Sequence, residues 1–126
     1  MTTILLVDDD PLQAHLVMSL LGRQSVAVRR VNDAGEALCL IEEPDFARKL
    51  GLVISGNHTM GIGGPAFVAE VRSRMPAVPV LVLGMNGEVP ANYADDHVVF
   101  LPRHLVWEQM AGLTSRMLAH ARSQVA

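Results

Sequence analysis

Apolar residues follow two patterns that alternate along this chain. Short, largely apolar runs are typical of strands buried in a parallel sheet, and they span residues 3–8, 26–31, 52–55, 79–83 and 98–101. Apolar residues at helical spacing predict helices over residues 11–21, 34–43, 64–75 and from 105 onward. Five strands that alternate with helical segments predict an α/β fold, with a doubly wound five-stranded parallel sheet and helices on both faces.

Local signals mark where some of these elements begin. Asp10 precedes Pro11, as an N-cap precedes a first helical residue, and Asp33 begins a capping box with Glu36 three residues later. Residues 44–50 are expected to form a connection that packs back onto the core. Residues 85–97, which are rich in turn-forming residues, leave room for one short irregular helix.

Composition excludes several classes of function. With 126 residues the chain is expected to form one domain, residues 1–126. Half of the residues are apolar but only 4% are aromatic, so the stacking rings of carbohydrate or single-strand binders are lacking. The net charge is -3 and the ten basic residues are scattered, so no direct nucleic-acid binding is expected.

The sequence gives no sign of a leader peptide or a membrane span. A basic first segment is lacking, and so is an apolar run of about 18 residues. The single Cys39 cannot form an internal disulfide, which agrees with a reducing compartment, and a cytoplasmic location is expected. Because Cys39 lies in an apolar helical stretch, it is expected to be buried and unreactive.

The candidate functional residues lie at the carboxyl ends of the predicted strands, where open α/β sheets bind their ligands. Asp8 and Asp9 follow the first strand and are either weak ligands of a divalent cation or surface acids, whereas Asp10 is expected to cap a helix. The loop over residues 55–64 contains no acid, Lys or Arg. His58 in this loop would add an imidazole ligand, but no second His is placed nearby. No nucleophile there has a paired base, so no enzyme activity is expected.

Five motifs occur in order across the full length of the chain. They are ILLVDDDP at 4–11, AGEAL at 34–38, LVI at 52–54 followed by MGIGG at 60–64, PVLVL at 79–83 and FLPR at 100–103. With these residues the chain resembles the receiver domain of bacterial two-component response regulators, which has a flavodoxin-like (CheY-like) fold. Each motif alone is a weak signal, but the five together are specific.

The resemblance implies a phosphotransfer site, most of whose positions are changed here. The family uses two acids that hold Mg²⁺, an Asp that accepts phosphate, a Thr or Ser after the fourth strand and a Lys after the fifth. Here the acid pair is Asp8 and Asp9, the acceptor position is Gly56, the hydroxyl position is Gly84 and the Lys position is Arg103. Glycine has no nucleophile, so the resemblance implies an atypical receiver, or pseudo-receiver, that is not phosphorylated at the usual site and binds Mg²⁺ weakly or not at all.

Two residues at this site, Phe100 and Arg103, keep the kind of side chain that the family has there. Phe100 keeps an aromatic ring at the position where the family switches a ring between rotamers, but without a phenol it is expected simply to be buried. Arg103 is expected to form an ion pair with Asp8 or Asp9 in the vacated pocket. The alternative is an arginine that points outward into solvent.

Two functions from different classes follow from these residues. The first is a protein–protein interaction module of a two-component or phosphorelay system, whose partner is a signalling kinase, an output protein or a second copy of the chain. The resemblance implies a partner face over residues 86–120, in which Trp107 is an anchor if exposed and a core residue if buried. The alternative is a small-anion or metal sensor that uses the pocket left by the missing side chains at Gly56 and Gly84.

Overall fold

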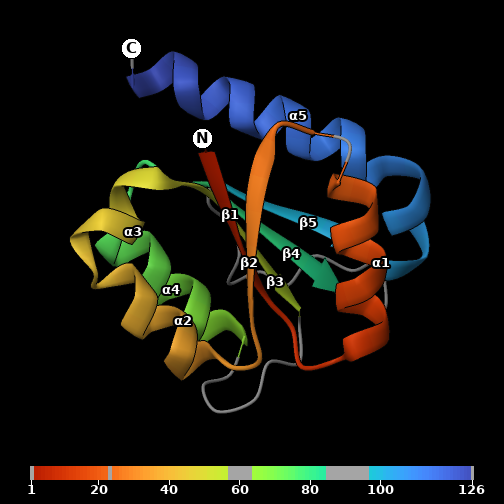
Figure 1. Ribbon diagram of the computed structural model, residues 1–126, viewed down its shortest axis with the longest axis horizontal. Helices are drawn as coiled ribbons and strands as arrows, with labels where there is room; N and C mark the ends of the chain where they lie inside the picture. The colour runs from red at the N-terminus through yellow and green to blue at the C-terminus, as the bar shows by residue number, and fades with distance from the viewer. Residues whose placement is uncertain (1, 23, 57–63, 85–96, 126) are drawn as a thin grey trace.

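Five parallel strands form one sheet in the order β2-β1-β3-β4-β5 (Figure 1). The computed structural model describes residues 2–22, 24–56, 64–84 and 97–125. The strands are β1 (Thr2–Val7), β2 (Val26–Val31), β3 (Leu50–Gly56), β4 (Val80–Gly84) and β5 (Val98–Pro102). The five predicted strands and the doubly wound sheet are therefore confirmed. The strand order reverses between β1 and β3, so their carboxyl ends flank the crevice where such sheets bind ligands.

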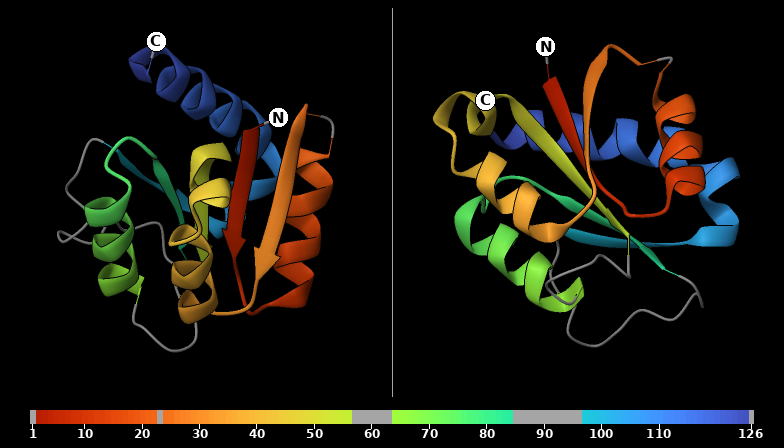
Figure 2. Two further views of the ribbon diagram at one scale, coloured as in Figure 1. Left: turned by 60° about the vertical axis from the view of Figure 1, so that its left-hand side comes forward. Right: turned by 60° about the horizontal axis from the view of Figure 1, so that its bottom comes forward.

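Helices cover both faces of the sheet, as the turned views show (Figure 2). On one face lie α1 (Pro11–Leu21) and α5 (Val106–Val125). On the other lie α2 (Ala34–Ile41), α3 (Pro44–Lys49) and α4 (Gly64–Arg74). A short 3-10 helix, η2 (Arg103–Leu105), joins β5 to α5.

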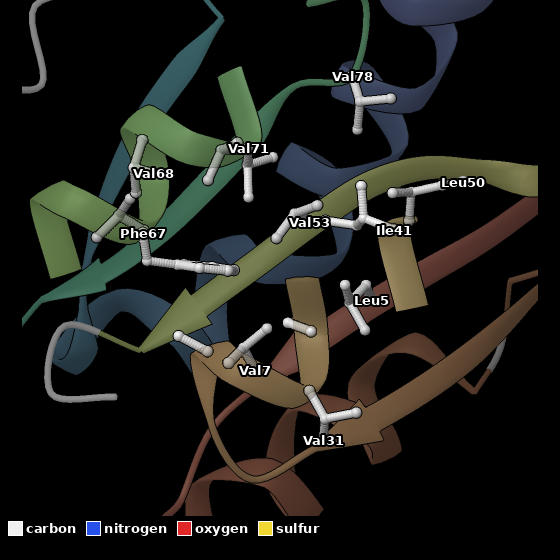
Figure 3. Packing of buried hydrophobic residues seen from close by; sticks show 14 residues of the cluster. Leu5, Val7, Val31, Ile41, Leu50, Val53, Phe67, Val68, Val71 and Val78 are labelled. Atoms are coloured by element: carbon white, nitrogen blue, oxygen red, sulfur yellow. The ribbon is translucent and has the colours of Figure 1, made fainter. Parts of the chain in front are cut away.

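Alternating side chains along the strands divide the core into two clusters. From β1, Leu5 and Val7 face the α2–α4 side, whereas Ile4 and Leu6 face the α1–α5 side. The α2–α4 cluster, drawn in Figure 3, includes the helix residues Ala34, Ala37, Ile41, Phe67, Val68 and Val71. The other cluster includes the helix residues Ala14, Val17, Leu21, Val106, Met110, Met117 and Leu118. Because the sheet is covered on both faces, the inner strands β1, β3 and β4 are buried on both faces, whereas the edge strand β2 carries Arg29 and Arg30.

The predicted start of α2 at Asp33 is confirmed. Asp33 is the N-cap, and its Oδ1 accepts a hydrogen bond from the backbone N–H of Glu36 at 2.8 Å. The Glu36 carboxylate in turn accepts from the backbone N–H of Asn32 at 3.2 Å. The cap at Asp33 is therefore as predicted, but the return bond from Glu36 goes to Asn32, one residue before the N-cap, and not to Asp33 as in a strict capping box.

The expectation that residues 44–50 pack back onto the core is confirmed, because Leu50 belongs to the α2–α4 cluster and Phe46 packs against it, but the form of the segment differs. Most of this segment is the helix α3, not an open connection. Pro44 occupies the first turn, where its missing N–H leaves no helical hydrogen bond unmade, and Arg48 pairs with Asp45 three residues earlier. Such a short helix has too few apolar positions to give a helical pattern in the sequence.

Cys39 is exposed, so its expected burial was wrong. The buried positions of α2 are Ala34, Ala37 and Ile41, which are three and four residues apart. Cys39 is two residues from Ala37 and two from Ile41, so the helical period turns it away from the sheet.

The irregular helix expected within residues 85–97 falls almost entirely outside the described residues, as does most of the glycine-rich loop after β3. Among the helices that are described, none has a long enough apolar run to cross a bilayer.

Candidate functional site

The carboxyl end of β1 leads into a buried acid, Asp8, which is only 1% exposed. Its Oδ1 accepts a hydrogen bond from the backbone N–H of Asp10 at 2.9 Å, and its Oδ2 accepts from Nε2 of Gln13 at 2.5 Å. The guanidinium of Arg30 donates to the backbone carbonyl of Asp8, at 3.1 Å from Nη2 and 3.3 Å from Nε. Both carboxylate oxygens therefore have donors, as burial of a charged group requires.

The two acids that follow Asp8 have different surroundings. Asp9 is exposed. Asp10 is the N-cap of α1, and its Oδ1 accepts from the backbone N–H groups of Leu12 at 3.0 Å and Gln13 at 3.4 Å. The expected cap at Asp10 is therefore confirmed, and the three consecutive acids do not act as one cluster.

Gly56 ends β3 directly beside Asp8. A Cβ placed on Gly56 would lie 3.4 Å from Cγ of Asp8 and 3.5 Å from each of its carboxylate oxygens, which is ordinary van der Waals contact. The hydroxyl of the neighbouring Ser55 is buried and donates to the carbonyl of Gly56 at 3.2 Å. The structure thus brings Asp8 and Gly56 together, and Gly56 presents only backbone there.

The space beside Gly84, at the end of β4, is filled by the ring of Phe100 from β5. A Cβ placed on Gly84 would overlap Cζ and Cε2 of this ring and would lie 2.8 Å from Cε1. Phe100 is partly buried and packs against the α2–α4 core cluster, so its expected burial is confirmed only in part. The pocket expected from the missing side chains is closed on its Gly84 side.

Arg103 does not form the expected ion pair with Asp8 or Asp9. Its Nη1 lies 3.9 Å from Oδ2 of Asp10, which is the outer limit of an ion pair, and the Arg103 side chain is 26% exposed. The carboxylate oxygens of Asp8 accept hydrogen bonds from Asp10 and Gln13 instead. The Nε of Arg103 is buried and has no hydrogen-bond partner among the described residues.

The residues at this site fit a magnesium ion poorly. Mg²⁺ prefers an octahedron of oxygen ligands, usually one or two carboxylates with substrate phosphate. Gly56 supplies no oxygen from a side chain, and both oxygens of Asp8 already accept hydrogen bonds. In the described part of the chain, no group of three His, Cys, Asp or Glu residues is placed to hold a metal.

Trp107, in the first turn of α5, is 69% exposed. Of the two alternatives left open by the sequence, the structure therefore supports an exposed indole rather than a core residue. His58 lies outside the described residues, as does the part of the predicted partner face that precedes residue 97.

Gln13 and Arg30 were missed as partners of Asp8. The sequence does carry a signal for Gln13. It follows the N-cap Asp10 at the spacing of a capping box, in which the side chain of the third helical residue turns back toward the start of the helix. Arg30 had no local signal. Its position depends on the pairing of β2 with β1, which sequence spacing does not specify.

Two curated relatives share recognisable sequence with this chain. The transcriptional regulatory protein AruR of Pseudomonas aeruginosa is 31% identical over 111 residues, which cover 82% of this chain and 46% of that protein. The two-component response regulator PhoP of the same species is 33% identical over 102 residues, which cover 76% of this chain and 44% of that protein. The chain therefore spans a little under half the length of these relatives. No protein-family model matches the sequence.

Solved structures support the same fold. The signal receiver domain of an HD domain-containing protein from Pseudomonas fluorescens Pf-5 superposes with a TM-score of 0.84. The match covers 98% of this chain and 90% of that one at 22% sequence identity. Identity at this level supports the fold and not the chemistry of the site.

Proposed function

Because this chain is a receiver domain of the response-regulator family, with the CheY-like fold, we propose that it is a pseudo-receiver that signals through protein contacts without phosphorylation at the usual site. The observation that carries the proposal is the bare backbone of Gly56 against the Asp8 carboxylate, where a Cβ would lie 3.4 Å from Cγ of Asp8. Formation of an acyl phosphate needs a carboxylate nucleophile in line with the donor phosphorus, and glycine has none.

The neighbouring acid is a poor substitute for the missing one. Asp8 is buried, and each of its oxygens accepts a hydrogen bond from within the chain. These bonds stabilise the carboxylate where it is and make its oxygens less nucleophilic. Arg103, at the family's Lys position, lies nearest to Asp10 and not to Asp8.

Incubation with acetyl phosphate and MgCl₂, followed by intact mass, tests the proposal. The wild-type chain is expected to remain unmodified, while a phosphorylation-competent receiver in the same mixture gains a phosphoryl group. The variant Gly56→Asp restores a carboxylate at a position where a Cβ would make only ordinary contact with Asp8, and it is expected to gain more phosphoryl adduct than the wild type. A phosphoryl adduct on the wild-type chain would contradict the proposal.

The positive part of the proposed function is binding to a protein, either a signalling kinase, an output protein or a second copy of the chain. Trp107 supports it. A large aromatic side chain that is 69% exposed buries much apolar area at a low entropy cost when a partner covers it. The turn of η2 and the start of α5 hold it on a rigid helix beside the carboxyl end of β5.

A Trp107→Ala variant tests this part. The immobilised wild-type chain is expected to retain a partner from cells of its source, and the variant to retain at least about tenfold less. Cys39→Ala is the control, because Cys39 is exposed but lies on α2, which covers the opposite face of the sheet from α5. Equal loss of the partner in both variants, or in neither, would contradict the role of Trp107.

The alternative function, a small-anion or metal sensor, has less support. The Phe100 ring occupies the space beside Gly84, and the Asp8 carboxylate next to Gly56 repels an anion. The buried Nε of Arg103 is the only feature among the described residues that favours an anion, and the nearby Asp10 opposes it.

A further inference from the structure

The ring of Phe100 crosses from β5 to the adjacent strand. In the parallel pairing of β4 with β5, Val82 is opposite Phe100 and Gly84 is opposite Pro102. Val80, Val82 and Gly84 share one face of β4 because strand side chains alternate, and this face packs on the α2–α4 cluster. The ring therefore begins beside Val82 and reaches diagonally to the end of β4.

Phe100 and a side chain at position 84 exclude each other. A Cβ at Gly84 would fall inside the ring, in contact with three of its atoms. The backbone of Gly84 does not explain the glycine, because its φ lies outside the left-handed range that disfavours other residues. The atoms that would collide are the far end of the Phe100 side chain, so a side chain at 84 would be accommodated by rotating the ring away.

We infer that Gly84 and Phe100 form an aromatic lock, in which the missing side chain at position 84 lets the Phe100 ring lie permanently over the end of β4. In this arrangement the ring itself fills the space beside Gly84. The apolar ring of Phe100 therefore lies where the resemblance places the hydroxyl group of a Thr or Ser at position 84.

The lock defines how the proposed function is regulated. Phe100 lies in β5, which leads through η2 directly to Trp107 in α5. With the ring held in one position, the surface formed by β5 and the start of α5 keeps one conformation. Partner binding is then constitutive. This step rests on the proposed function, whereas the lock itself rests only on the contact between the two residues.

Fluorine NMR with fluorophenylalanine reads the ring position in the full chain. The sequence has three phenylalanines, and Phe100→Leu assigns the resonance. In the wild type, the Phe100 resonance is expected to be single, little broadened by a soluble gadolinium chelate and unchanged by acetyl phosphate with MgCl₂. In Gly84→Ala it is expected to shift and to broaden strongly. A wild-type resonance that is already strongly broadened, or that moves with acetyl phosphate, would overturn the lock.

A thermal double-mutant cycle gives an independent readout. Gly84→Ala is expected to lower Tm by about 4 °C or more in the wild type. It is expected to leave Tm unchanged or raise it in the Phe100→Ala background, because Ala is favoured over Gly in a strand once the ring is gone. Phe100→Leu is the background to use if Phe100→Ala does not fold. An equal loss of Tm in both backgrounds would overturn the lock. The thermal cycle and the broadening by the gadolinium chelate do not depend on whether the wild-type chain can be phosphorylated, so a failure of the lock in these readouts is distinguishable from a failure of the proposed function.

Discussion

At the scale of single residues, Asp8 is the most informative acid of the site. It is one of two acids at the family's metal-binding positions, yet its two oxygens accept hydrogen bonds from Asp10 and Gln13. The sequence was sufficient to place Asp8, Gly56 and Gly84 at neighbouring strand ends. It was not sufficient to give the partners of Asp8, because those depend on side-chain distances that strand and helix spacing leave open.

Replacement of Asp8 by Ala is expected to destabilise the fold. The substitution leaves the backbone N–H of Asp10 and the amide of Gln13 without their acceptor, at a cost of about 1–3 kcal/mol in the free energy of unfolding. Urea denaturation measures this. Asp9→Ala is the matched control, and since Asp9 is exposed its effect should stay within about 0.5 kcal/mol. A stabilised Asp8→Ala variant would contradict this prediction, because it would mean that the desolvation of the buried carboxylate destabilises the fold more than its hydrogen bonds stabilise it.

At the scale of elements, helix starts were the most predictable features and short helices the least. Asp33 with Glu36 and Asp10 with Pro11 gave correct starts because capping is local. Helix α3 and the exposure of Cys39 were missed, because the first has too few residues for a pattern and the second depends on which side of α2 meets the sheet.

The start of α1 allows the cap to be separated from the ion pair. Asp10→Ala removes the acceptor for two backbone N–H groups and is expected to cost about 1 kcal/mol in the free energy of unfolding. Arg103→Ala removes only a contact of 3.9 Å from a partly exposed side chain and is expected to cost less than about 0.5 kcal/mol. Chemical denaturation of both variants in one buffer makes the comparison. An equal loss in the free energy of unfolding for Arg103→Ala and Asp10→Ala would contradict this prediction, because the contact between Arg103 and Asp10 would then stabilise the fold as much as the helix cap does.

At the scale of the whole molecule, the order of elements was readable because buried parallel strands have continuous apolar runs and the described crossovers, from β1 to β2, β2 to β3 and β3 to β4, each carry a helix. The sheet brings the altered positions to one edge, as the resemblance implied. The sequence could not show that the ring of Phe100 fills the space beside Gly84. The closure of the Gly84 side by Phe100 depends on a contact between two strands and on a rotamer.

The central claim is that the strand ends of this receiver domain do not respond to a phosphoryl group. The most direct measurement is the ¹H–¹⁵N spectrum of the chain with and without beryllium fluoride and MgCl₂, since this complex mimics an aspartyl phosphate. The account predicts unchanged amide shifts for Asp8, Gly56, Gly84 and Arg103. Saturable shifts clustered at these residues would contradict it.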